Sequence, residues 1–143
     1  IIQKGVIEKK VKISLDIDQY KFYVQANEFL RDIIENILDN AVKYNTNQIV
    51  KVVIRIREEQ INENVFIKLE FIDNGIGIKN RDKKAIFRRG YRVDGNVSGR
   101  GLGLSLSMRI LSSYNGKIWV EDNVEGDHTK GSNFILLIPK AIL

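Results

Sequence analysis

Alternating and continuous apolar runs along the chain predict six β-strands. Residues 6–15 alternate between apolar and polar side chains, which is the period of a strand with one buried face. Five further runs are rich in Val, Ile, Tyr or Phe, as strands are. They are residues 22–25, 49–57, 65–73, 117–121 and 133–138. Turn residues around Asn62-Glu63-Asn64 separate two of these runs and predict a hairpin between them.

Two other segments have the apolar spacing of helices. The first begins at Phe29 with Asn27 as its expected N-cap, and it should end near Tyr44-Asn45. The second covers residues 102–114 and is stopped by Asn115-Gly116. Strands with helices packed on one face form an α+β protein. The sequence therefore predicts a two-layer α/β sandwich with a mixed β-sheet, in one domain over residues 1–143.

The long segment of residues 74–100 has no clear period beyond short helical signals at 81–87. A compact domain rarely holds more than about 15 irregular residues unless they are functional or disordered. Glycines are grouped at both ends of the segment, next to a strand and next to a helix. This grouping favours a flexible lid over a plain disordered loop.

Composition excludes several kinds of site and partner. The chain has 143 residues and no cysteine, and His128 is its one histidine, so disulfides and zinc sites of several Cys or His ligands are excluded. No apolar run approaches the roughly 20 residues that cross a bilayer. The net charge is +5, but basic and acidic residues are mixed, which favours a solvated surface over a nucleic-acid interface. Because the chain does not begin with Met, we expect it to be part of a longer protein.

Polar residues within the first helix indicate a site. At about 100° per residue, Asn40 lies about 60° from Ile37, the centre of the apolar face, and Asn36 lies at the edge of that face beside Lys43. One such amide could simply bond to the backbone. Two amides one turn apart, followed by a lysine, predict a groove in which amide oxygens meet Mg²⁺ and the lysine meets phosphate.

Asp73 ends a predicted strand and is followed by Asn74-Gly75-Ile76-Gly77-Ile78. A carboxylate between two isoleucines can accept a hydrogen bond from the exocyclic amine of a nucleotide base, and glycines allow a flat ring to approach. A simple turn after a strand is an equally good explanation of this segment taken alone.

A third glycine-rich segment, Gly99-Arg100-Gly101-Leu102-Gly103-Leu104, opens the second helix. Free N–H groups at a helix start bind anions. The spacing is neither the dinucleotide fingerprint nor a Walker loop. Arg88, Arg89 and Arg92 lie in the segment before it and could reach phosphates, or could form a solvated basic patch.

In this order the segments resemble the histidine-kinase branch of the GHKL ATP-binding superfamily, which also includes gyrase, MutL and large heat-shock chaperones. Residues 36–44 resemble the N box, residues 73–77 the G1 box, residues 87–90 the F box and residues 99–104 the G2 box. The resemblance covers nearly the whole chain. It implies an α/β sandwich that binds ATP and Mg²⁺ under a flexible lid.

The resemblance also assigns roles to residues. It implies Asn40 and Asn36 as metal ligands, Lys43 and Tyr44 as phosphate contacts, and Asp73 and Gly77 as adenine contacts. Arg89 is the expected catalytic residue, and the remaining expected nucleotide contacts are Gly75, Ile78, Arg92, Gly99, Arg100, Gly101, Leu102 and Gly103. Arg88 departs from the family pattern, because many members have an acid there.

One position separates the branches of the superfamily. The ATPase members have, four residues before the magnesium Asn, a Glu that activates water, and this chain has Asn36 there. An amide cannot accept the proton of a water, and Glu35 points about 100° away. The resemblance therefore implies transfer of phosphate to a histidine on an upstream dimerisation domain, then to a response regulator. That upstream domain would also make the full-length protein a homodimer.

No acceptor histidine is expected within the chain, because His128 lies in a predicted solvated turn. The domain should lie in the cytoplasm, in a protein that could be membrane-anchored. Three alternatives stay open: a GHKL-type ATPase or conformational switch, a degenerate module that binds only nucleotide or a partner, and an anti-sigma serine kinase. Sequence upstream, with a helix that carries His followed by an acid, would separate them.

Overall fold

A computed structural model describes residues 9–90 and 103–142. Five strands form one sheet in the order β1-β2-β3-β5-β4. Their bounds are β1 Lys10–Ile17, β2 Ile49–Ile61, β3 Asn64–Asp73, β4 Lys117–Val124 and β5 Asp127–Pro139. β1 and β2 are parallel, and the other neighbouring strands are antiparallel, so the sheet is mixed as predicted.

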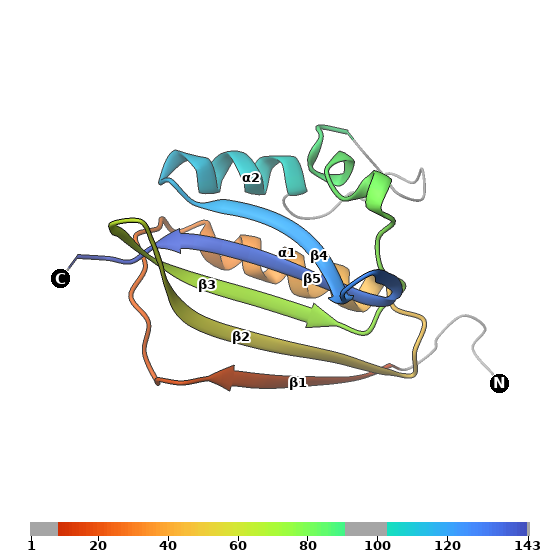
Figure 1. Cartoon of the computed structure of the whole chain (residues 1–143). Coiled ribbons are helices and arrows are strands. Elements are labelled where there is room, and N and C mark those ends of the chain that lie inside the picture. Colours follow the sequence, from red (N-terminus) through yellow and green to blue (C-terminus); the bar gives the residue numbers. More distant parts are fainter. Residues whose placement is uncertain (1–8, 91–102, 143) are drawn as a thin grey trace.

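Both helices lie on the same face of the sheet (Figure 1). They are α1 Leu30–Lys43 and α2 Leu104–Ser113, and two short 3₁₀ helices, η1 Asn80–Asp82 and η2 Ala85–Phe87, precede α2. α1 is the crossover that makes β1 and β2 parallel. The α+β sandwich predicted from the sequence is confirmed. No helix in the described ranges is long and apolar enough to span a membrane.

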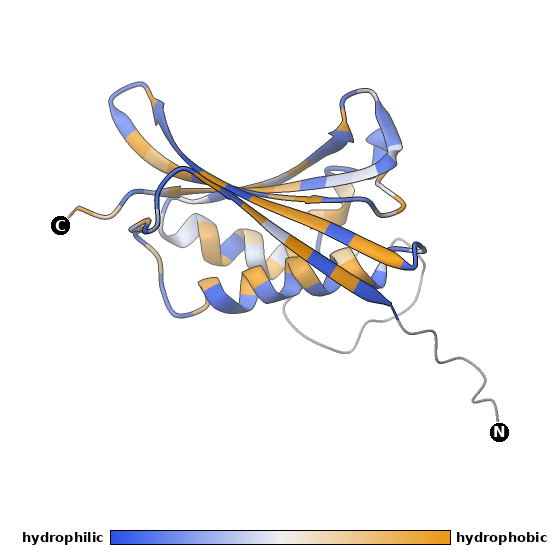
Figure 2. Cartoon of the chain, turned by 90° about the horizontal axis from the view of Figure 1, so that it is seen from below, coloured by the Kyte–Doolittle hydropathy of each residue, from blue (hydrophilic) through white to orange (hydrophobic). Residues whose placement is uncertain are grey.

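The core fills the space between the sheet and the helices. Ile33 and Ile37 of α1 meet Ile67, Leu69 and Phe71 of β3, and all five are buried. Figure 2 shows the alternation of apolar and polar residues along the strands that produces this buried face. Phe87 of η2 is also part of the core, and its ring packs edge-on against Phe134 of β5 with 6.4 Å between the ring centroids.

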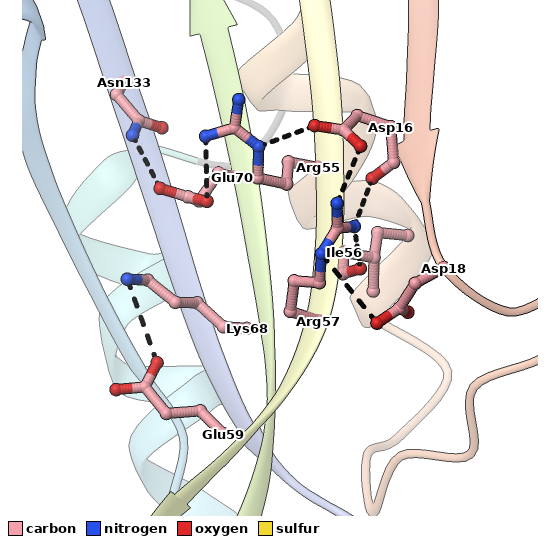
Figure 3. A network of polar contacts seen from close by, with 9 residues as sticks. All are labelled: Asp16, Asp18, Arg55, Ile56, Arg57, Glu59, Lys68, Glu70 and Asn133. Atoms are coloured by element: carbon pink, nitrogen blue, oxygen red, sulfur yellow. Dashed lines mark hydrogen bonds and ion pairs between the residues drawn. The ribbon is translucent and has the colours of Figure 1, made fainter.

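The opposite face of the sheet carries ion pairs (Figure 3). Arg55 of β2 lies 2.8 Å from Asp16 of β1 and 3.7 Å from Glu70 of β3, so three neighbouring strands are linked. Arg57 makes a second contact with Asp16 at 2.7 Å. Glu70 also accepts a hydrogen bond from the side chain of Asn133 on β5.

Several predicted boundaries were wrong. Residues 22–25 form no strand, and Val24 makes only a single bridge with Lys140. β1 runs to Ile17, two residues beyond the prediction, and residues 6–8 lie outside the described ranges. Asn27 does not cap α1: its side chain accepts the N–H of Phe29, one residue before the helix begins at Leu30.

The strands of the two hairpins are longer than predicted. Asn62 and Glu63 are the only residues between β2 and β3, and Asn62 has a φ of 56°, which an Asn tolerates better than most residues. In the second hairpin, Gly126 with a φ of 83° turns the chain so that Val124 pairs with Asp127. His128 is the second residue of β5 and is half-buried. Its expected place in a solvated turn is therefore wrong.

Candidate functional site

The two flanks of α1 differ in chemistry. Its buried stripe is Ile33, Ile37 and Ala41. On one flank Leu38 and Val42 pack against the buried valines of β2. The other flank carries Asn36, Asn40 and Lys43, of which the two amides are half-buried and the lysine is exposed. Asn36 and Asn40, one helical turn apart, therefore form an amide column on the flank of α1 that faces away from β2.

Asn36 holds an orphan donor. Its Nδ2 atom is buried and has no hydrogen-bond partner within the described ranges. A buried donor without an acceptor costs about 1–3 kcal/mol, so such a group needs an explanation. A phosphate oxygen would satisfy Nδ2, and an amide oxygen is a suitable Mg²⁺ ligand. Within residues 9–90 and 103–142 there is no group of three or more His, Cys, Asp or Glu side chains that could hold a metal ion.

The end of α1 is joined to the turn that follows β3. The carbonyl of Tyr44 accepts the N–H of Ile76 at 3.1 Å. A Cβ atom at Gly75 would lie 2.7 Å from that carbonyl oxygen, so the close approach requires glycine. Lys43 Nζ lies 5.2 Å from the centre of the Tyr44 ring, which keeps the ammonium group at the same end of the helix.

Three asparagines that the sequence reasoning missed fix this junction. Asn45, 1% exposed, donates to the side chain of Asn74 at 2.8 Å and accepts two hydrogen bonds from Asn47. Asn47 donates in turn to the carbonyl of Asn74 at 2.7 Å. Lys9 donates to the carbonyl of Val42 at 3.0 Å and satisfies one of the last carbonyls of α1. For Asn45 and Asn47 the available signal was a short polar residue soon after a predicted helix, and for Asn74 it was the turn after a predicted strand.

Asp73 is a buried carboxylate held by backbone donors. It is 6% exposed, and its Oδ1 atom accepts the N–H of Gly75 at 2.8 Å and that of Ser132 at 3.1 Å. Burial raises the pKa of Asp73 above 3.8, and these two hydrogen bonds oppose the rise. Both of these hydrogen bonds end on Oδ1. The second oxygen is suited to an external donor such as an amine.

The glycines of this turn serve the packing of the protein itself. A Cβ atom at Gly77 would lie 1.5 Å from the carbonyl oxygen of His128, and Gly77 has a φ of 75°. Gly131, which the sequence reasoning missed, has a φ of 114°, and its Cβ would lie 2.0 Å from the carbonyl oxygen of Asp73. Gly75 and Gly77 were expected to admit a flat ring. The structure shows that contacts with Tyr44 and His128 already require them.

The remaining predicted residues lie along the edge of this region or outside the described ranges. Ile78 is half-buried and packs against the core. Arg88 and Arg89 follow η2 and are exposed. Gly103 is the N-cap of α2, and a Cβ atom added there would meet no atom of the described residues within 4 Å. Arg92, Gly99, Arg100, Gly101 and Leu102 lie outside the described ranges.

Comparison with known proteins identifies the family. The family model described as histidine kinase-, DNA gyrase B- and HSP90-like ATPase matches residues 25–142. The chain belongs to this family. Its relatives include the sensor protein PhoQ of Escherichia coli K12, which is 36% identical over 126 residues, and the sensor protein kinase WalK of Staphylococcus aureus, which is 28% identical over 163 residues. The alignments include 87% and 99% of this chain.

A solved structure agrees with this assignment. The catalytic domain of the histidine kinase ThkA superposes with a TM-score of 0.68 at 26% identity, covering 91% of this chain and 80% of that domain. The family member described here is thus an ATPase-type domain of the kind that sensor histidine kinases carry. It spans 24% of the length of PhoQ and 38% of the length of WalK.

Proposed function

We propose that this domain binds Mg-ATP and donates the γ-phosphoryl group to a histidine on an upstream dimerisation domain, from which a response regulator receives it. One observation carries the proposal. The half-buried amides of α1 include the donor of Asn36 that has no partner among the described residues. The end of this helix is joined, through the carbonyl of Tyr44, to the turn that holds the buried Asp73. A nucleotide needs such a pair of features, one for its phosphates and metal and one for its base.

Each side chain has a task in this proposal. Asn40 and Asn36 would hold Mg²⁺ through their amide oxygens, and the orphan Nδ2 of Asn36 would donate to phosphate. Lys43 would meet phosphate as a point charge, with Tyr44 beside it. Asp73 would accept the adenine amine, with Gly75, Gly77 and Ile78 shaping the turn. When bound, Mg-ATP would supply the phosphoryl group, and its magnesium ion would neutralise part of the phosphate charge.

Positioning and charge neutralisation would supply most of the catalysis, as is usual in phosphoryl transfer. Arg89 is the proposed catalytic residue, because it is exposed after η2 and its guanidinium group could contact a transferring phosphate. Arg92, Gly99, Arg100, Gly101, Leu102 and Gly103 complete the proposed phosphate contacts.

The side chains on α1 favour transfer to a protein over hydrolysis. Asn36 cannot take a proton from water, and its neighbour Glu35 is exposed and pairs with Arg31 at 3.1 Å, on the solvent side of the helix. A general base for water is therefore missing from the position where an ATPase would need one. This supports a kinase rather than the ATPase or conformational switch that the family also contains.

The short span of the chain relative to PhoQ and WalK supports the proposal that residues 1–143 are one domain of a longer kinase. In that longer protein we expect a homodimer formed by the upstream domain and a cytoplasmic position for this one. A response regulator is the proposed partner, and nucleic acid is not.

Calorimetric titration of the 143-residue chain with Mg-ATP tests the proposal. We expect heat of binding from the wild type and a loss of at least about tenfold in affinity in Asn40→Ala, since even outer-shell changes at metal sites cost 10–100-fold. Asn64→Ala is the matched control, because Asn64 starts β3 at the far end from Asp73. No binding by folded wild type, or equal binding by Asn40→Ala, would contradict the proposal.

Phosphate release separates the two candidate activities. The proposal predicts very slow release of phosphate by the chain alone, because a water would find no base at Asn36. Asn36→Glu should raise this release while Asn64→Ala leaves it unchanged. Rapid release by the wild type would favour the ATPase.

A further inference from the structure

The pairing of β4 with β5 is interrupted beside Asp73. Asp122 pairs with Ser132 and Val124 pairs with Asp127, so Asn123 alone stands opposite the four residues 128–131. Such irregularities are frequent next to functional sites, where they redirect a side chain. The extra residues of β5 reach the turn after β3, since a Cβ atom at Gly77 would meet the carbonyl of His128.

The redirected side chain of Asn123 holds the main chain of Asp73. Its Nδ2 atom donates to the carbonyl oxygen of Asp73 at 2.7 Å and lies 3.3 Å from the carbonyl oxygen of Lys130. One amide of β4 therefore links the end of β3 to the extra residues of β5, although 50 residues separate Asn123 from Asp73.

This contact replaces a missing step of the β-ladder. The pairing of β3 with β5 ends at Ile72 and Asn133. At the next step Ser132 donates its N–H to the side chain of Asp73 and not to its carbonyl, so the carbonyl is left for Asn123. The arrangement requires Gly131, because any Cβ there would lie 2.0 Å from the same carbonyl oxygen.

These hydrogen bonds hold Asp73 from two sides. Gly75 and Ser132 hold Oδ1, and Asn123 holds the main-chain carbonyl, so both the side chain and the backbone of Asp73 are constrained. Removing the Asn123 donor would leave a carbonyl oxygen beside a buried carboxylate without its partner. Asp73 would then lose the constraint that directs its second carboxylate oxygen.

We propose that Asn123 is a positioning residue that sets the preference of this site for a 6-aminopurine nucleotide, through the main chain of Asp73. The inference rests on the proposed binding of ATP. The Nδ2 atom of Asn123 already donates to the carbonyl oxygens of Asp73 and Lys130, so its proposed action on the base is indirect. It acts by holding Asp73 where one carboxylate oxygen can accept the amine, and its effect should therefore depend on that amine being present.

Two ligands that differ only in the amine test this role. Titration of the 143-residue chain with Mg-ATP and with the magnesium complex of purine riboside triphosphate, which has hydrogen in place of the 6-amino group, gives a selectivity ratio. We expect Asn123→Ala to weaken ATP binding about three- to tenfold, the worth of one hydrogen bond, and to leave binding of the analogue unchanged. Asn123→Asp, which sets an acceptor against the Asp73 carbonyl, should lower the ratio further, and Asn64→Ala should not change it.

The outcomes are distinguishable. A fall in affinity for ATP alone supports the inference, and rescue of the ratio by Asn123→Gln would support it further. An equal fall for both ligands would assign Asn123 a general structural role and overturn the inference, as would an unchanged ratio in both variants. If wild type binds ATP and Asn123→Ala keeps the same preference for ATP over the analogue, only this inference is contradicted. Folded wild type that binds neither ligand contradicts the proposed function itself.

Discussion

The carbonyl oxygen of Tyr44 accepts the N–H of Ile76 at 3.1 Å, and this hydrogen bond joins the C-terminal end of α1 to the turn after β3. The two residues come from different layers of the sandwich. Helix ends leave carbonyls without partners, and here the turn supplies a donor to one of them. The junction brings the amide flank of α1 and the carboxylate of Asp73 to one end of the domain.

Gly75→Ala should strain this junction. The added Cβ would lie 2.7 Å from the Tyr44 carbonyl oxygen and 3.1 Å from Oδ1 of Asp73, and backbone atoms cannot easily move away. We expect a loss of about 1–3 kcal/mol in the free energy of unfolding, measured by urea denaturation. Gly103→Ala is the control, since a Cβ atom added at Gly103 would meet nothing within 4 Å among the described residues. Equal effects of the two substitutions would contradict the close contact.

Asp73→Asn should change how stability depends on pH. Burial raises the pKa of Asp73 in the folded state above the ordinary 3.8, so ionisation costs the folded state more than the unfolded state. That cost is absent below the unfolded pKa and is complete above the raised folded pKa. Asn keeps an acceptor for Gly75 and Ser132 but never ionises.

The stability of Asp73→Asn relative to wild type should therefore increase as the pH rises from about 3 to about 7. Denaturant unfolding of both proteins at the two pH values measures this difference. In the same variant, Mg-ATP binding should be weakened, because an amide N–H would face the adenine amine. If the stability of Asp73→Asn relative to wild type does not change with pH, burial does not raise the pKa of Asp73.

Lys83, which lies between η1 and η2, forms an ion pair with Asp122 of β4 and so anchors the two 3₁₀ helices to the sheet. Their charged atoms are 2.6 Å apart, and their side chains are 16% and 10% exposed. Removing one partner of a fully buried pair costs about 3–5 kcal/mol, and we expect about 1–3 kcal/mol for Lys83→Met because this pair is partly hydrated. Adding Asp122→Leu to Lys83→Met should recover part of the loss.

The exposed pair of Arg31 and Glu35 provides the matched control. Its side chains are 86% and 56% exposed, so Arg31→Met should change the free energy of unfolding by less than about 1 kcal/mol. Denaturant unfolding of wild type, Lys83→Met, Asp122→Leu and the double variant gives the coupling between Lys83 and Asp122, and Arg31→Met is measured beside them. A Lys83→Met variant as stable as Arg31→Met would contradict an anchoring role for the pair.

Asp16 should stabilise the outer face of the sheet only when ionised. Hydrogen bonds from Arg55 and then from Arg57 lower its pKa below 3.8 (Figure 3). The stabilisation is therefore complete above the unfolded pKa and is lost as the pH falls through the lowered folded pKa. Asp16→Asn should lower the melting temperature slightly near neutral pH, and the difference should shrink in acid and in high salt. Asp18→Asn, whose carboxylate is 3.8 Å from Arg57, should have a smaller effect.

The sequence predicted most elements correctly, and its errors have local causes. The spacing of Ile33, Ile37 and Ala41 fixed the buried side of α1, and with it the amide flank. Residues 22–25 look like a strand, but they lie beside the last residues of β5 and make one bridge. β4 and β5 extend past their apolar runs because ladder hydrogen bonds form between backbones, whatever side chains they carry.

Part of the candidate site could be read from the chain, and part could not. Asn36, Asn40, Asp73 and the glycines that follow stand in short segments with strong local chemistry. Asn123 and Gly131 carry no such signal, because one acts on a residue 50 positions away and the other makes room for it. Asn45 resembles any polar residue after a helix until its burial is known.

The sequence by itself determined which face of each element is apolar, where the donors and acceptors stand along the chain, and that they follow the order of one ATPase family. Those properties are local, since they depend on side-chain type and on the periods of helices and strands. Only the tertiary structure decided that Asn123 takes the carbonyl of Asp73 while Ser132 takes its carboxylate. The reason is physical: the register and irregularities of neighbouring strands arise from packing the whole sheet, and no short segment specifies them.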